Sequence, residues 1–176
     1  DMGLTKIASK VFLPRQKELE RHYTNPEKIQ HHVLKHLVEK GCETEYGRTH
    51  IFSGINNYSD FTKNVPINTY EELKNDIDRM RHGEQDVLWP GLIKWFAKSS
   101  GTTNDKSKFI PVSNAGLHRI HYKGGADVVA LYLRNNPQSR LFDGKSLILG
   151  GSHSPNYNVE GSLVGDLSAI LIENIN

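Results

Sequence analysis

The chain has 176 residues, and its 22 basic and 20 acidic side chains are mixed along the sequence, for a formal net charge of +2. Because a protein that binds a polyanion needs clustered positive charge, this pattern argues against a nucleic acid partner. The apolar runs are far too short to cross a bilayer, and the start shows no secretory leader pattern, so we expect a cytoplasmic protein that needs no membrane.

The first forty residues predict two helical elements. Apolar residues three and four apart within Leu4–Phe12 predict an amphipathic helix, and Pro14 should interrupt it because its ring clashes with the preceding turn. A second helix is expected to start with Asn25 as N-cap and Pro26 at its first position, and to end at Gly41.

A capping-box pattern predicts a third helix. Thr69 and Glu72 have the spacing at which a hydroxyl and a carboxylate satisfy free backbone N–H groups, and Gly83 should end the helix that follows. Residues 1–90 are therefore expected to form a mainly helical N-terminal segment.

Residues 91–176 predict an α/β segment. The apolar runs Trp95–Ala97 and Leu147–Leu149 are typical of buried strands, and Ser113 is expected to cap a long helix between them that ends near Asn135. The inner stripe of that helix should consist of Leu117, Ile120, Val128 and Leu131. The predicted fold class is thus mixed α/β, with a helical first part.

A further apolar helix is expected at Leu167–Ile172, only a few residues before the sequence stops at Asn176. Because a complete domain seldom stops inside an element, we expect the chain to be the first portion of a longer protein. Residues 91–176 would then be an incomplete part of one large domain.

The segment Ser99–Lys108 combines hydroxyl side chains, one glycine and two lysines directly after a predicted strand. Gly101 allows the backbone to approach phosphate oxygens, and successive N–H groups in such a turn can bind an anion. Lys106 and Lys108 can add charge-assisted contacts. The segment is no Walker loop, because Lys106 and Ser107 stand where that motif has glycine and lysine. These residue types alone fit a solvated surface loop equally well.

Several other segments occur together with this loop in a recognisable order. They are Tyr46–His50, Val65–Ile67, Tyr70–Lys74, Gly83–Glu84, Asp86–Gly91, Phe109–Val112, Phe142–Lys145, Leu147–Gly151 and Gly165–Ser168. With the Ser/Thr-rich run around Gly101-Thr102-Thr103, they resemble the Gretchen Hagen family. These auxin-responsive promoter proteins are acyl acid amido synthetases of the adenylate-forming superfamily. The resemblance covers nearly the whole chain from about Thr44 onward.

This resemblance implies the N-terminal portion of an ATP-dependent ligase. Such an enzyme adenylates a carboxylic acid with ATP and Mg²⁺, releases pyrophosphate, and passes the acyl group to an amino acid. The resemblance assigns ATP phosphate binding to Ser99, Ser100, Gly101, Thr102, Thr103, Lys106 and Lys108. Asp105 departs from the pattern, because many relatives have glycine there, and this puts the path of the second half of the loop in doubt.

The resemblance also suggests a substrate contact. Arg119 falls near a position at which some relatives use arginine to hold the acyl carboxylate, a task that suits a guanidinium fork. An ordinary surface arginine on a helix is the alternative. The catalytic residues and the metal ligands are not identified by the sequence, and the chain alone is not expected to complete the reaction.

Two other functions stay open. An acyl-adenylating enzyme that passes its acyl group to a thiol would carry the same loop. A non-catalytic nucleotide-binding module is the second alternative, and Asp105 is the local feature that favours it. The expected partners are a small-molecule carboxylic acid and an amino acid.

Overall fold

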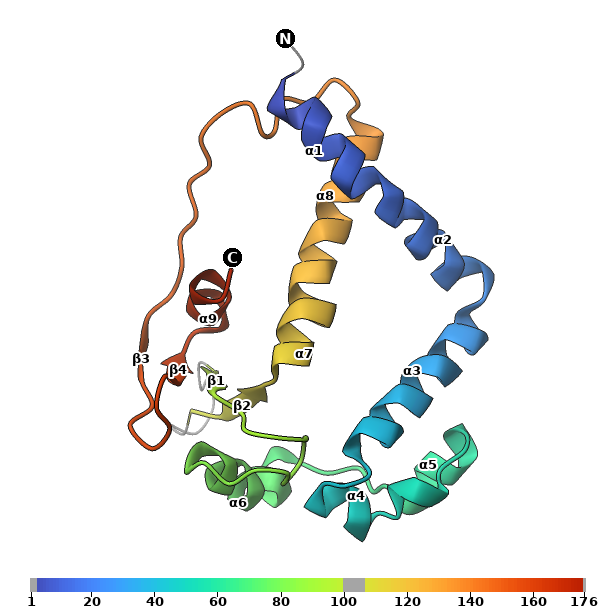
Figure 1. Ribbon diagram of the computed structural model, residues 1–176, viewed down its shortest axis with the longest axis vertical. Helices are drawn as coiled ribbons and strands as arrows, with labels where there is room; N and C mark the ends of the chain where they lie inside the picture. Colours follow the sequence, from blue (N-terminus) through green and yellow to red (C-terminus); the bar gives the residue numbers. More distant parts are fainter. Residues whose placement is uncertain (1–2, 100–106, 176) are drawn as a thin grey trace. The chain divides into compact units, whose positions relative to one another are not determined.

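The computed structural model describes residues 3–99 and 107–175 of the chain. They form two compact units, each made from two stretches of the sequence (Figure 1). The first unit combines residues 1–29 with 114–149, and the second combines residues 30–113 with 150–176. No helix in the described ranges has the length and apolarity needed to span a membrane.

The first unit is helical. Its elements are α1 (Leu4–Phe12), the 3-10 turn η1 (Leu13–Arg15), α2 (Gln16–Thr24), α7 (Asn114–Gly116), the π-helical segment η3 (Leu117–Tyr122) and α8 (Lys123–Asn135). Pro14 lies in η1, so the predicted interruption of the first helix is confirmed. The long helix predicted after Ser113 is confirmed as the succession of α7, η3 and α8.

Ion pairs connect the first helices to α8, which packs against α1, η1 and α2. The Nε–H of Arg15 donates to Asp127 at 2.5 Å, and the ammonium of Lys123 lies 3.0 Å from the carboxylate of Glu18. The hydrogen bond from Lys123 lowers the pKa of Glu18. These pairs connect η1 and α2 to α8.

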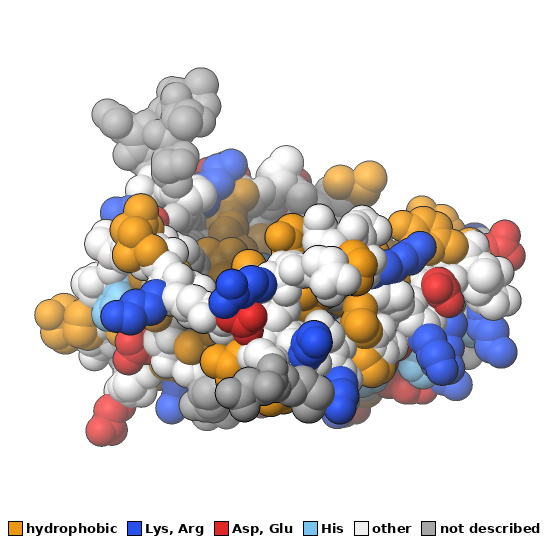
Figure 2. Space-filling model, turned by 90° about the horizontal axis from the view of Figure 1, so that it is seen from above, with side chains coloured by type: hydrophobic (Ala, Val, Ile, Leu, Met, Phe, Trp, Pro, Cys, Tyr) orange, Lys and Arg blue, Asp and Glu red, His pale blue; other side chains and the backbone are white. Residues whose placement is uncertain are grey.

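Much of the surface predicted to face a core is exposed, and Figure 2 shows hydrophobic side chains at several places on one face of the molecule. The exposed members of the predicted helix faces are Leu4, Ile7, Val11, Ile120, Val128 and Leu131, whereas Leu117 is buried. The prediction of an inner stripe is therefore wrong for Ile120, Val128 and Leu131 and correct for Leu117. Helical periodicity identifies a face that is apolar, but it does not identify a segment that covers it.

Asp143 connects the segment after α8 to the start of α1. Its carboxylate accepts hydrogen bonds from the backbone N–H of Thr5 at 2.9 Å and from the Thr5 hydroxyl at 3.1 Å. The Thr5 hydroxyl, which belongs to a buried residue, accepts in turn from the N–H of Phe142 at 2.9 Å. The backbone hydrogen bond from Thr5 is the main cause that lowers the pKa of Asp143 below its ordinary value of 3.8.

The substitution Asp143→Asn is expected to lower the thermal unfolding midpoint at neutral pH. The pKa of Asp143 is lower in the folded than in the unfolded chain. At pH values above the ordinary pKa of 3.8, the ionised carboxylate therefore makes its full contribution to stability. This contribution is lost as the pH falls through the folded-state pKa. Unfolding midpoints of the two proteins should therefore converge in acid. Glu20→Gln removes an exposed carboxylate of α2 and is the control. A difference in unfolding midpoint between Asp143→Asn and the wild type that does not change with pH would contradict this role of Asp143.

Helices precede the strands in the second unit. α3 (Pro26–Gly41) begins in the first unit and continues into the second, and it is followed by α4 (Glu45–Thr49), η2 (Phe52–Gly54), α5 (Tyr58–Asn64) and α6 (Tyr70–Arg81). The predicted start of α6 is confirmed, because the Glu72 carboxylate accepts from the Thr69 N–H at 2.6 Å and from its hydroxyl at 2.8 Å. Gly83 follows the helix with a φ of +95°.

The strands of the second unit form one four-stranded sheet with the order β2-β1-β4-β3. They are β1 (Trp95–Lys98), β2 (Phe109–Val112), β3 (His153–Pro155) and β4 (Leu163–Gly165), and α9 (Leu167–Glu173) follows β4. β1 pairs antiparallel with β2 and parallel with β4, and β4 pairs antiparallel with β3. Phe96 of β1 is fully buried, in a cluster with Met80, Val87 and Ile93.

The strand predicted at Leu147–Leu149 is wrong. The structure has no strand in this segment, and the three side chains are 86, 71 and 85% exposed. The strand parallel to β1 is β4 instead. An apolar run indicates a tendency to be buried, but strand formation also needs a pairing partner. The run Leu147–Leu149 precedes β3 and pairs with none of the four strands of the described sheet. The mixed α/β fold class itself is confirmed, and the division at residue 90 stays a prediction.

Candidate functional site

The parallel strands β1 and β4 end at the same edge of the sheet, and this edge carries charged side chains. The register pairs Ala97 with Gly165, so the residues that follow them, Lys98 and Asp166, are neighbours across the two strands. β2 and β3 begin at the same edge. In open α/β sheets, ligands bind outside the carboxyl ends of parallel strands. We refer to this end of the sheet as the carboxyl edge.

The predicted phosphate-binding loop leaves the sheet at the carboxyl edge. The N–H of Ser99 donates to the carbonyl of Lys108 at 2.9 Å, and the N–H of Lys108 donates to the Ser99 hydroxyl at 3.3 Å. The two ends of the loop therefore lie together, directly beyond β1 and before β2. Five further predicted loop residues lie outside the described residues, namely Ser100, Gly101, Thr102, Thr103 and Lys106.

Helix α6 contacts the second end of this loop. The hydroxyl of Tyr70 accepts a hydrogen bond from the N–H of Phe109 at 2.9 Å. The ammonium of Lys108 lies 5.4 Å from the centre of the Tyr70 ring, within the range of a cation–π contact. The guanidinium carbon of Arg81 lies 3.7 Å from the centre of the Phe109 ring. The first and last residues of α6 thus contact Lys108 and Phe109, the residues with which the loop returns to the sheet.

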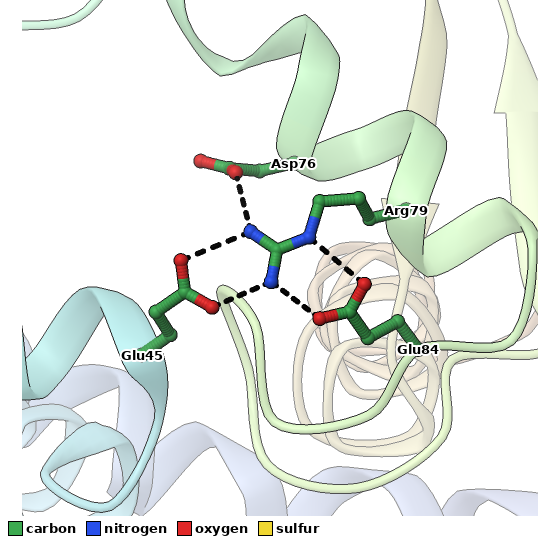
Figure 3. A network of polar contacts seen from close by, with 4 residues as sticks. All are labelled: Glu45, Asp76, Arg79 and Glu84. Carbon is green, nitrogen blue, oxygen red and sulfur yellow. Dashed lines mark hydrogen bonds and ion pairs between the residues drawn. The ribbon is translucent and has the colours of Figure 1, made fainter.

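Arg79 fixes α6 to its neighbours through Glu45 and Glu84, and it also binds Asp76 of the same helix (Figure 3). Its guanidinium donates to both oxygens of Glu45, at 2.9 and 2.5 Å, and to Asp76 at 3.1 Å. It also donates through Nε to Glu84 at 2.8 Å, and a second bond joins the same two side chains. The hydrogen bonds from Arg79 lower the pKa of Glu45 and of Glu84. Both carboxylates stay ionised around Arg79, and the network connects α4, α6 and the segment after α6.

A pocket of about 640 Å³ lies at the carboxyl edge. Its lining includes Arg81, Lys98, Phe109, His153, Asn156 and Asp166. This volume is in the range of small-molecule sites, roughly 300–1,000 Å³. Sequence reasoning did not identify the pocket, because its residues come from α6, from all four strands and from the segment between β3 and β4.

Arg81 is only partly paired in this pocket. Its Nη1 donates to Asp78 at 3.2 Å, whereas its buried Nε–H has no hydrogen-bond partner in the described part of the chain. Such an unmet donor costs about 1–3 kcal/mol. The Asn156 amide donates to the Arg81 carbonyl at 3.1 Å, which connects the segment between β3 and β4 to α6. Asp166 accepts from the N–H of Ser152 at 2.9 Å.

The predicted acid-binding residue Arg119 belongs to the first unit, where it is exposed on the π-helical segment η3. π-helical turns inside α-helices are frequent at functional sites. The role of Arg119 stays a prediction. Within residues 3–99 and 107–175, no group of three or more His, Cys, Asp or Glu side chains has the arrangement of a metal site.

Known proteins resemble this chain over most of its length. Residues 15–176 match the family model described as the GH3 family N-terminal domain. Indole-3-acetic acid-amido synthetase GH3.15 from Arabidopsis thaliana is 35% identical over 132 residues, which are 74% of this chain and 21% of that protein. The 4-substituted benzoates-glutamate ligase GH3.12 from the same organism is 32% identical over 108 residues, 61% of this chain and 18% of that protein.

Solved structures of acyl acid amido synthetases also resemble this chain. The structure of AtGH3.15 acyl acid amido synthetase in complex with 2,4-DB aligns with a TM-score of 0.76 and 27% sequence identity, and the match covers 95% of this chain and 28% of that one. A second structure, of GH3.15 acyl acid amido synthetase, aligns with a TM-score of 0.75 and 29% identity over 90% of this chain and 28% of that one. The chain spans about a fifth of the length of the curated relatives it matches.

Proposed function

The chain belongs to the GH3 family, and on this premise we propose that it carries the ATP phosphate-binding part of an acyl acid amido synthetase. The protein would adenylate a small carboxylic acid and then transfer the acyl group to an amino acid. A carboxylate is a poor electrophile, and adenylation supplies the leaving group that it lacks. The amine of the amino acid attacks the acyl carbon, loses a proton, and AMP leaves.

The position of the loop is the observation that carries this proposal. Ser99 and Lys108 close the loop at the carboxyl edge, directly beyond β1 and beside the parallel strand β4. Hydroxyl and backbone N–H groups at such an edge can surround phosphate oxygens. The proposed phosphate-binding residues are Ser99, Ser100, Gly101, Thr102, Thr103, Lys106 and Lys108.

Lys108 and Mg²⁺ would neutralise different parts of the phosphate charge. The ammonium of Lys108 lies within cation–π range of the Tyr70 ring, at the point where the loop rejoins the sheet. Mg²⁺ bound with ATP would supply positive charge against the pyrophosphate leaving group. Arg119 is proposed to hold the carboxylate of the acid.

The names of the relatives support an acid and an amino acid as substrates, since GH3.12 is named a ligase of benzoates and glutamate. A thiol acceptor and a non-catalytic nucleotide-binding module are the alternatives, and product analysis separates the three. The intact protein is incubated with MgATP, a panel of aromatic and aliphatic acids, and either mixed amino acids or coenzyme A. Mass spectrometry should detect an amide together with AMP. A thioester would identify a thiol acceptor, and ATP binding without AMP formation would identify the module.

A further inference from the structure

The peptide group between Lys108 and Phe109 is held from two sides. Its carbonyl oxygen, which belongs to Lys108, accepts a hydrogen bond from the N–H of Ser99 at 2.9 Å. Its N–H, which belongs to Phe109, donates to the hydroxyl of Tyr70 at 2.9 Å. The C=O and N–H of a trans peptide point in opposite directions, so one bond runs to the end of β1 and the other to α6. This peptide group therefore connects β1 with α6 at the point where the loop re-enters the sheet.

The strand register explains why the N–H of Phe109 needs a partner outside the sheet. β2 is an outer strand in the order β2-β1-β4-β3. Ser99 and Lys108 lie opposite each other and are joined by hydrogen bonds, so the adjacent pair, Lys98 and Phe109, is of the non-hydrogen-bonded kind. The N–H of Phe109 then points away from β1, to the side where the described sheet has no further strand. The Tyr70 hydroxyl takes the place that a strand would have.

The aromatic ring of Tyr70 contacts the far end of the Lys108 side chain. The Lys108 ammonium lies 5.4 Å from the centre of this ring, within the range of a cation–π contact. Tyr70 is partly buried, whereas Lys108 is exposed. One side chain of α6 thus contacts both the peptide group that follows Lys108 and its ammonium group.

Tyr70 occupies a well-defined position in the second unit, because it is the first residue of α6. The capping box of Thr69 and Glu72 fixes the first turn of this helix, and the Glu72 carboxylate accepts from the Thr69 N–H at 2.6 Å. Near the other end of the helix, Arg79 binds both carboxylate oxygens of Glu45, which belongs to α4. A side chain on an element supported in this way is suited to holding a neighbouring residue in place.

We propose that Tyr70 is a positioning residue for Lys108. Its hydroxyl holds the backbone with which the loop returns to β2, and its ring holds the ammonium group that would contact the phosphates. The proposal rests on the proposed function, in which Lys108 binds ATP. Tyr70 itself does not contact the nucleotide in this proposal, so its side chain should matter for ATP binding only when Lys108 is present.

A double-mutant cycle tests this dependence in the intact protein. Calorimetric titration with MgATP is carried out on the wild type, Tyr70→Leu, Lys108→Ala and the double variant. Tyr70→Leu removes both contacts and is expected to weaken MgATP binding about 5- to 10-fold. In the Lys108→Ala background, the same substitution should change the affinity by less than about 2-fold. A purely structural role of Tyr70 would instead give equal losses in the two backgrounds.

Tyr70→Phe separates the two contacts, because it removes the hydroxyl and keeps the ring. Its MgATP affinity should lie between those of the wild type and Tyr70→Leu. Tyr58→Phe and Tyr58→Leu are the matched controls, since Tyr58 is an exposed tyrosine at the first position of α5, and both should bind MgATP as the wild type does. Thermal unfolding checks that each variant is folded during the titration, and if Tyr70→Leu is not, Tyr70→Phe in both backgrounds completes the cycle.

The outcomes distinguish this proposal from the proposed function. A wild-type protein that does not bind MgATP would refute the proposed function, and the role of Tyr70 with it. Binding that falls in Lys108→Ala but is unchanged in both Tyr70 variants would overturn the role of Tyr70 alone. Equal losses from the Tyr70 substitution with and without Lys108 would also overturn it, whereas a loss seen only with Lys108 present would support it.

Discussion

Replacing Lys108 by alanine is expected to weaken MgATP binding to the intact protein by about 10- to 100-fold, because a charge-assisted hydrogen bond contributes about 1.5–3 kcal/mol. Lys108 closes the phosphate-binding loop through Ser99, and its ammonium lies against the Tyr70 ring. Calorimetric titration with MgATP measures the effect. Lys63→Ala, at an exposed position of α5, is the matched control and should bind MgATP as the wild type does.

Lys106→Ala should have an effect of similar size, and the double variant should bind more weakly than either single variant. The two side chains are proposed to contact phosphate oxygens of the same nucleotide, so their effects need not add. Full wild-type affinity in both single variants would show that the loop does not bind the phosphates. Weakened binding in Lys63→Ala would show that general surface charge, and not the loop, sets the affinity.

Phe96→Ala is expected to destabilise the protein by about 3–5 kcal/mol. Phe96 is fully buried in β1 and packs in the cluster of Met80, Val87 and Ile93, so the substitution removes apolar contacts and leaves a cavity. Because β1 leads directly into the phosphate-binding loop, the variant should also lose MgATP binding at temperatures where the wild type binds.

Denaturant titration or thermal unfolding measures the stability change. Ile67→Ala is the control, because Ile67 is fully exposed and its truncation should change the unfolding free energy by less than about 0.5 kcal/mol. A Phe96→Ala variant as stable as Ile67→Ala would contradict the assignment of this cluster as the core of the second unit.

Helices with terminal signals could be predicted from the sequence. Asn25 and Pro26 marked the start of α3, and Thr69 with Glu72 marked the start of α6. These signals are local, because a cap satisfies N–H groups of its own first turn. The interruption at Pro14 is equally local.

The strands were harder to predict because pairing is not local. β1 was predicted from its apolar run, but β2, β3 and β4 have only three or four residues each and show no clear alternation. The run Leu147–Leu149 has the composition of a strand and no partner, whereas Leu163–Gly165 pairs with β1. The exposed face of α1 has the same explanation, since its periodicity predicts an apolar side without naming what packs on it.

In the candidate site, too, the local part could be predicted from the sequence and the non-local part could not. The loop was found from consecutive residues and from its resemblance to a family, and the structure places its two ends together at the carboxyl edge. The pocket joins Arg81, Lys98, Phe109 and Asp166, which are far apart in the sequence, so no motif could identify it. The contact of Tyr70 with Phe109 likewise joins residues 39 positions apart.

Acid-dependent ATP–pyrophosphate exchange by the intact protein tests the central claim most directly, because it requires the loop to bind ATP and the protein to form an acyl-adenylate. We expect exchange that depends on Mg²⁺ and on a carboxylic acid, and that falls about 10-fold or more in the Lys106→Ala and Lys108→Ala variants. Absence of exchange across a broad panel of acids, with MgATP still bound, would contradict the claim and identify a nucleotide-binding module without ligase activity.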